Sequence, residues 1–311
     1  MVTVSSTTAQ VTLSKVTISN GLAQFGGGIY NLGALTLNSI VVSRNTASGP
    51  SGCKSGCGGS GRGIYNGGTL TIKNSTISGN TSTVPFGCLF GCVNGGGGIS
   101  NGGVMTVNDS TISENKASNS IARSGGVGGG ISNSGTLTLN NSTVAFNSAT
   151  GIFGTGGGIA NEGSALTPAQ FNANNSTVAS NTASASLGGG IYNNTGEATL
   201  QNTILANSSG GNCVGGVTSN DYNLSSDGTC NFNNTGDLNS TDPQLGPLQK
   251  NGGPTETMAL PSGSPAIDAG NPAGCTDNTG KLLKTDQRGM PRPDKEDTGG
   301  CDMGAYESQI D

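Results

Sequence analysis

The strongest constraint on this chain is a glycine-rich signature that returns at nearly constant spacing. An Ile follows a short glycine run, and an Asn always stands two residues after that Ile. The spacings between successive isoleucines are 35, 35, 32, 28 and 32 residues, for Ile29, Ile64, Ile99, Ile131, Ile159 and Ile191. A period of this size is typical of a solenoid, in which each repeat is one supersecondary unit.

Each repeat contains short stretches with strand periodicity and none with helical periodicity. The segment Leu70–Ile72 alternates apolar and polar residues, an Asn follows shortly, and alternation resumes at Ser75–Ile77. The glycine signature supplies a third strand. Three strands per turn with apolar residues inward predict an all-β, right-handed parallel β-helix of about seven turns, because stacking buries the face that a single turn leaves open.

Two columns of Asn recur at the predicted corners. Asn tolerates the left-handed conformation that a corner needs, and stacked amides can bond along the axis. A structural role is therefore the main interpretation. The columns are Asn31, Asn66, Asn101, Asn133, Asn161 and Asn193, and Asn45, Asn80, Asn115, Asn147 and Asn181.

The pattern stops after Asn207, which predicts repeats over 1–207 and a capping region over 208–311. An open solenoid end exposes apolar core and unpaired strand edges, so a cap is needed. We expect a fixed polar network within it, formed by Asp268, Asp286, Arg288, Arg292, Asp302 and Glu307.

The eight cysteines indicate disulfides and an oxidising compartment. We expect the pairs Cys213–Cys230 and Cys275–Cys301. Four others occupy equivalent places in two adjacent repeats, where disulfides within or between loops are the first interpretation and a four-thiolate zinc site the second. These are Cys53, Cys57, Cys88 and Cys92.

Composition excludes several functions. The 311 residues include no His, so no Ser-His-Asp or Cys-His nucleophile system is available, and no cofactor is expected. A net charge of −5 with thirteen scattered Lys and Arg argues against nucleic acid. No apolar run reaches the roughly 18 residues of a membrane span, and no signal peptide precedes the first strand. We expect a mature or trimmed piece of an exported protein.

Insertions in a solenoid map to one face, often the binding face. Here the long stretches 46–60, 81–95 and 116–127 follow the corner Asn in three repeats and predict a wall beside the N-terminal half. A glycan-binding site is expected against this wall, with Arg62, Phe86, Phe90 and Arg123 as its ligand-binding residues.

A resemblance to a known family is carried by four C-terminal segments: Gly252–Thr255, Ser264–Gly270, Thr285–Gly289 and Asp302–Glu307. Together with the glycine repeats they resemble bacterial choice-of-anchor Q proteins, which are exported right-handed parallel β-helix proteins, and the likeness covers nearly the whole chain. It implies fold and location and transfers no catalytic residue. A weaker likeness links the repeats to those of polymorphic outer-membrane proteins, an adhesin group.

Three functions follow as expectations. The first is an extracellular or cell-surface bacterial protein, structural or adhesive, that binds a polysaccharide or cell-surface glycan. The second is a polysaccharide hydrolase or lyase that uses Asp109 and Glu114 as a carboxylate pair, with Arg62 or Arg123. The third is an ice-binding face made by the regular outward Thr columns. The ordinary interpretation of Asp109 is that it replaces Asn in a corner column.

Overall fold

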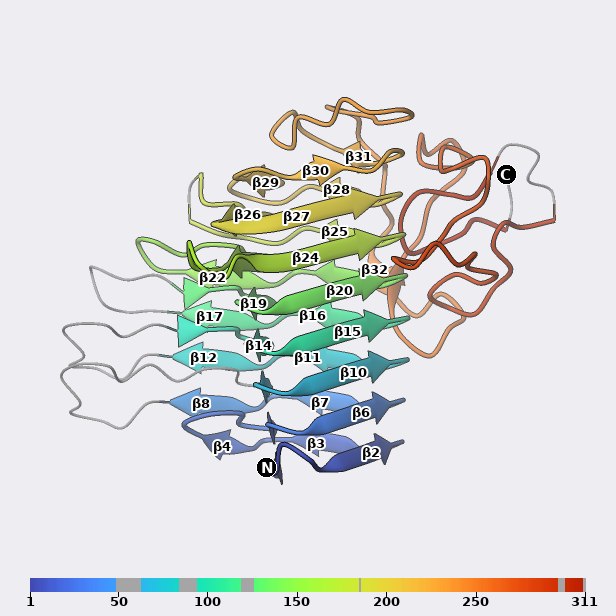
Figure 1. Cartoon of the computed structure of the whole chain (residues 1–311). Coiled ribbons are helices and arrows are strands. Elements are labelled where there is room, and N and C mark those ends of the chain that lie inside the picture. The colour runs from blue at the N-terminus through green and yellow to red at the C-terminus, as the bar shows by residue number, and fades with distance from the viewer. Residues whose placement is uncertain (49–62, 84–93, 119–125, 185, 296–299, 310–311) are drawn as a thin grey trace.

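The computed structural model describes all residues except 49–62, 84–93, 119–125, 185, 296–299 and 310–311. The described residues form strands and no helix, so they include no helix that could cross a bilayer. Three parallel sheets, A, B and C, each contain eight strands, and each turn of the chain adds one strand to every sheet. This arrangement is the parallel β-helix that the repeat predicts (Figure 1).

The strands are short and stack in chain order. Sheet A contains β1 (Val2–Val4), β5 (Ile29–Asn31), β9 (Ile64–Asn66), β14 (Ile99–Asn101), β19 (Ile131–Asn133), β23 (Ile159–Glu162), β26 (Ile191–Asn194) and β29 (Cys213–Val214). Sheet B contains β2 (Gln10–Ser14), β6 (Ala34–Asn38), β10 (Thr69–Lys73), β15 (Val104–Asn108), β20 (Thr136–Asn140), β24 (Ala169–Asn174), β27 (Gly196–Gln201) and β30 (Thr218–Ser219). Sheet C contains β3 (Thr17–Ser19), β7 (Val41–Ser43), β11 (Thr76–Ser78), β16 (Thr111–Ser113), β21 (Thr143–Ala145), β25 (Thr177–Ala179), β28 (Ile204–Ala206) and β31 (Leu224–Ser225).

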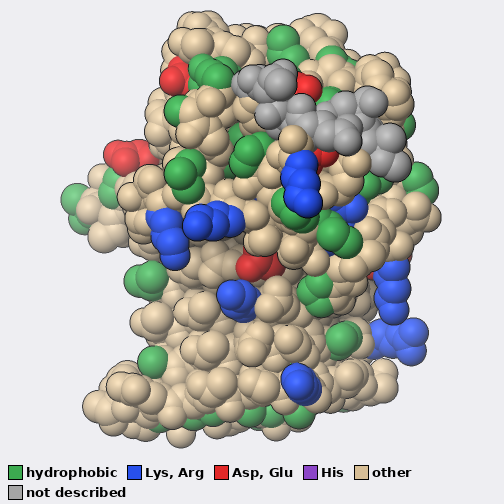
Figure 2. Space-filling view, turned by 90° about the vertical axis from the view of Figure 1, so that its right-hand side faces the viewer, with side chains coloured by type: hydrophobic (Ala, Val, Ile, Leu, Met, Phe, Trp, Pro, Cys, Tyr) green, Lys and Arg blue, Asp and Glu red, His purple; other side chains and the backbone are tan. Residues whose placement is uncertain are grey.

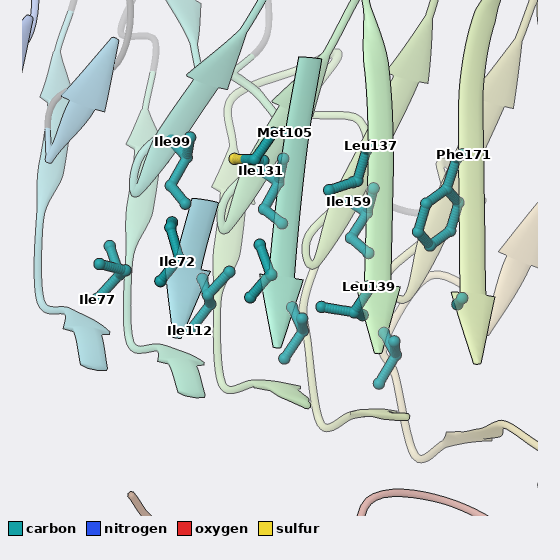
Figure 3. Packing of buried hydrophobic residues seen from close by; sticks show 14 of the residues in the cluster. Ile72, Ile77, Ile99, Met105, Ile112, Ile131, Leu137, Leu139, Ile159 and Phe171 are labelled. Atoms are coloured by element: carbon teal, nitrogen blue, oxygen red, sulfur yellow. The ribbon is translucent and has the colours of Figure 1, made fainter. Parts of the chain in front are cut away.

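The core is a set of apolar columns, because equivalent residues of successive turns pair in register. Leu70, for example, pairs with Leu35 on one side and Met105 on the other. The labelled side chains in Figure 3 show how these columns fill the interior between the sheets. The predicted core residues are all buried, which confirms the assignment of inward positions: Ile64, Leu70, Ile77, Ile99, Ile131, Leu137 and Val144.

Both Asn columns are buried hydrogen-bonded ladders, as expected. In the ladder between sheets A and B the amide of Asn66 donates to Asn101 at 2.7 Å. In the C-to-D ladder, between sheet C and a further sheet, D, Asn80 donates to Asn115 at 2.9 Å. A third ladder joins sheets B and C, where the backbone N–H of Ser75 donates to the hydroxyl of Ser110 in the next turn. Since a buried polar group without a partner costs about 1–3 kcal/mol, the ladders fix the corners in register.

A fourth sheet, D, was not expected. Its strands follow the C-to-D ladder and begin the stretches predicted as loops. The middle residue of each three-residue strand points inward and is small, as in Ala47, Ser82, Ala117 and Ala149. The strands are β4 (Leu22–Ala23), β8 (Thr46–Ser48), β12 (Thr81–Thr83), β17 (Lys116–Ser118) and β22 (Ser148–Thr150), and β13 (Asn94–Gly95) pairs with β18 (Gly126–Val127) beside them.

The solenoid continues past the expected boundary at residue 207. Strands β29, β30 and β31 extend sheets A, B and C by one further turn. The lateral segment, which comprises the described residues 243–295 and 300–309, runs down the side of the stack instead of covering its end (Figure 1). This lateral segment contains only the antiparallel pair β32 (Leu248–Gln249) and β33 (Thr257–Met258) among its described residues.

Candidate functional site

The lateral segment covers the outer face of sheet C from β16 onward. Met258, Leu260 and Met303 pack against Ile204 and the outward alanines of this face. Strands β16, β21, β25 and β28 are consequently buried on both faces, whereas β11 has half-buried outward residues. The solenoid therefore has one side that is an internal interface.

Polar contacts fix the register of this interface. Gln287 is buried between two turns, and it accepts a hydrogen bond from the Thr143 hydroxyl at 2.7 Å. Its amide donates to the Thr111 hydroxyl at 2.9 Å. The Thr177 hydroxyl accepts from the backbone N–H of Ala305. The outward Thr column on sheet C therefore binds the chain's own C-terminal segment.

The predicted polar network lies within the lateral segment, where all of its residues except the exposed Asp268 are buried. Arg288 pairs with Asp286 at 2.7 Å, and Arg292 pairs with Glu307 at 2.6 Å. The carboxylate of Asp302 accepts from the backbone N–H groups of Asp268 and Ser308. The expected network is confirmed for five of its residues, whereas Asp268 joins it only through its backbone N–H.

The Arg292–Glu307 ion pair is hydrogen-bonded to the solenoid through Asn141. Arg292 also donates to the side-chain oxygen of Asn141 at 3.0 Å. This contact directs the amide nitrogen of Asn141 the other way, toward Asp109 at 2.9 Å. A chain of hydrogen bonds thus runs from Glu307 through Arg292 and Asn141 to Asp109, and it orients the Asp109 carboxylate.

Asp109 lies in a groove between the B-to-C corner and the lateral segment. The groove has a volume of about 340 Å³ and is lined by Lys73 and Asn141 from the solenoid and by residues of the 277–285 loop, including Lys281 and Lys284. The three lysines are exposed, and none forms an ion pair within the described part of the chain. Figure 2 shows this face, where basic side chains lie above and below an acidic one.

The electrostatics of Asp109 are unusual for a surface carboxyl. Burial raises its pKa, while the hydrogen bond from Asn141 and the nearby charge of Lys73 oppose that rise without cancelling it. Asn141 occupies one carboxylate oxygen, and the other makes no hydrogen bond to a described residue. Asp109 therefore lines a basic groove and has one carboxylate oxygen that no described residue occupies.

The structure does not bring Glu114 to this groove. Asp109 and Glu114 both occupy left-handed corners, with φ of 50° and 57°, at opposite ends of β16. The strand β16 separates the two corners, and Glu114 is not among the residues that line the groove. Glycoside hydrolysis needs carboxyl groups about 5–10 Å apart within one site. Glu114 is exposed, and the Asp109 side chain bonds along the helix axis to the next turn.

The other predicted binding residues, Arg62, Phe86, Phe90 and Arg123, lie outside the described residues, as do Cys53, Cys57, Cys88 and Cys92. The two remaining pairs are disulfides, Cys213–Cys230 and Cys275–Cys301, as predicted. Such bonds fit an oxidising compartment. Within the described ranges no three acidic or Cys side chains gather as a metal site.

Sequence reasoning missed the lysines and Asn141. Lys73 stands out in its outward column on sheet B, whose other members are uncharged: Ser14, Asn38, Asn108, Asn140, Asn174 and Gln201. That exception was a usable signal. Lys281 and Lys284 carried none, because their position depends on how the lateral segment folds back.

The fold and groove define a parallel β-helix protein with a lateral C-terminal segment. No protein-family model, curated protein or solved structure matches the chain. The resemblance to choice-of-anchor Q proteins therefore stays a prediction.

Proposed function

We propose that this is an exported bacterial protein of the cell surface or extracellular space that binds an acidic polysaccharide. One observation carries the proposal: the groove combines three exposed lysines, which form no ion pair with a described residue, with an oriented carboxylate and amide. Lysine ammonium groups bind sugar carboxylates, while Asp109 and Asn141 can pair with hydroxyl groups. The two disulfides support the oxidising location.

The groove replaces the loop wall as the best-supported place for a glycan. It contains residues of two separate parts of the chain, so it is concave and chemically distinct from the uniform repeat faces. The site at Arg62, Phe86, Phe90 and Arg123 remains a separate prediction, because those residues lie outside the described ranges.

Binding to immobilised polygalacturonate tests the proposal, with dextran as the neutral polymer. The triple variant Lys73→Met, Lys281→Met, Lys284→Met should lose roughly tenfold or more in affinity, since each exposed charge contributes up to about 1 kcal/mol. Lys15→Met removes an exposed lysine from the first turn and should bind normally. Equal binding by the triple variant and the parent would exclude the groove.

An ice-binding face remains a second candidate because of one observation. The central outward column of sheet B is in register and has Thr in seven of eight strands: Thr12, Thr36, Thr71, Thr106, Thr138, Thr199 and Thr218, with Asn172 between. Thermal hysteresis that disappears in Thr71→Tyr would support it. A parent protein without hysteresis would eliminate it.

A further inference from the structure

We infer that the groove around Asp109 cleaves uronate-containing polysaccharide by β-elimination, with Asp109 as the base. The inference rests on the proposed binding function and adds a reaction to it. It also separates two chemistries that the sequence leaves together, hydrolysis and elimination.

Two carboxylates line the groove, and they differ in pKa. Hydrogen bonds from Thr279 and the backbone of Lys281 to one oxygen of Asp277 lower its pKa, whereas the pKa of Asp109 is raised. Hydrolysis would need Asp277 as the second carboxylate beside Asp109, since Glu114 stands at the far end of β16. Elimination needs one base together with cations, which matches what the groove contains.

Asp109 has the properties of a base for this step. Asn141 fixes one oxygen, so the other can approach a C–H bond without losing a partner. Its raised pKa strengthens it as a base relative to an ordinary carboxylate. Asn141 acts as a positioning residue, because Arg292 determines which way its amide points.

The lysines can stabilise the negative charge that develops during elimination. The hydrogen on C5 of a uronate lies beside a carboxylate, and removing it places negative charge on that carboxylate. Cations already in position stabilise such developing charge. Lys73 approaches from the solenoid and Lys281 and Lys284 from the lateral segment, so the sugar carboxylate can be flanked from both sides.

The step balances without an oxidant or reductant. Asp109 takes the proton from C5, the C5–H electron pair becomes the C4=C5 double bond, and the C4–O bond breaks with its pair on the leaving oxygen. Water gives that oxygen a proton, and Asp109 returns its own proton to water. The products are an unsaturated uronate end and a new hydroxyl end.

The test incubates the full chain with polygalacturonate, alginate or hyaluronate and follows both retention and the ultraviolet absorbance of the C4=C5 product. The key variant is Asp109→Asn. Asn occupies the same corner at Asn74 and Asn141, with φ of 49° and 51°, so the variant should fold. It should keep binding while product formation falls at least about 100-fold. Lys15→Met is the matched control and should retain both.

Each possible result either supports or overturns the elimination reaction. An unsaturated product that depends on Asp109 supports elimination. Retention of polymer without product, or new ends that lack the double bond, overturns elimination and leaves the binding proposal standing. Failure to retain any of the three polymers overturns both.

Discussion

Asn141 donates a 2.9 Å hydrogen bond to Asp109, 32 residues earlier in the chain and one turn below it in the solenoid. Both residues occupy the same left-handed corner column. Elsewhere in that column Asn202 donates to Asn175 in the same way. The Asp109 contact differs because Arg292 of the lateral segment orients the donor, so a structural ladder also becomes a means of holding a carboxylate.

Removing that donor should change both stability and titration. In Asn141→Ala, Asp109 loses the hydrogen bond that lowers its pKa, so the pKa should rise further. Arg292 also loses an acceptor, which should cost about 1–3 kcal/mol. Denaturant unfolding and carboxyl NMR titration measure the two effects. Asn74→Ala is the control, since Asn74 has the same backbone conformation and no side-chain hydrogen bond to a described residue.

The core columns should respond strongly to truncation. Leu137 is fully buried between Met105 and Phe171 of the neighbouring turns. Leu137→Ala should lower the free energy of unfolding by about 2–5 kcal/mol. Leu166→Ala alters a side chain that is 94% exposed and should change it by less than about 0.5 kcal/mol. Similar losses in the two variants would contradict the inward assignment.

The buried acid Asp302 should make stability depend on pH. Burial, and then the charge of Glu307, raise its pKa to about 7, from 3.8 when exposed. The folded protein therefore holds a proton that the unfolded chain releases, so this contribution is complete below about pH 3.8 and is lost as pH rises through about 7. The loss amounts to roughly 4 kcal/mol.

Urea unfolding between pH 4 and pH 8 measures this dependence. The variant Asp302→Asn cannot titrate at this position and should show a flatter profile over the same range. Parallel profiles for the parent and the variant would show that Asp302 is ionised throughout.

Glu114→Gly tests whether Glu114 is only a corner residue. A side chain in the left-handed region costs about 1–2 kcal/mol, and the equivalent corner of the preceding turn already has Gly79 with φ of 63°. Glycine's greater unfolded-state entropy offsets part of the gain, so we expect up to about 1 kcal/mol of added stability. Loss of glycan binding or cleavage in this variant would return Glu114 to the site.

Most of the solenoid could be predicted from the sequence because every turn is stabilised by the same interactions. Each turn satisfies the same needs with the same residue types, so Ile64, Leu70 and Asn66 recur at fixed intervals and reveal their positions. Sheet D was missed because its inward positions need only small residues, such as Ala117, which give weak alternation.

The docking of the lateral segment was harder to predict, since it depends on contacts between distant parts of the chain. One feature of the sequence did indicate this docking. The outward third position of sheet C is Ser43, Ser78 and Ser113 in early turns and Ala145, Ala179 and Ala206 in later ones. That change from polar to apolar begins at β21, one turn after β16, the first strand that the lateral segment covers. The candidate groove forms at this junction, so the sequence indicated only one of its residues, Asp109.

The lateral docking has a consequence for the order of events during folding. The segment bonds to Thr111, Thr143 and Thr177 on three successive turns, so its binding surface exists only after those turns have stacked. Contacts that join residues more than a hundred positions apart form late, because the chain between them must be ordered first. We therefore expect the groove to be assembled at the final step, so that a nascent or partly unfolded chain lacks the candidate site.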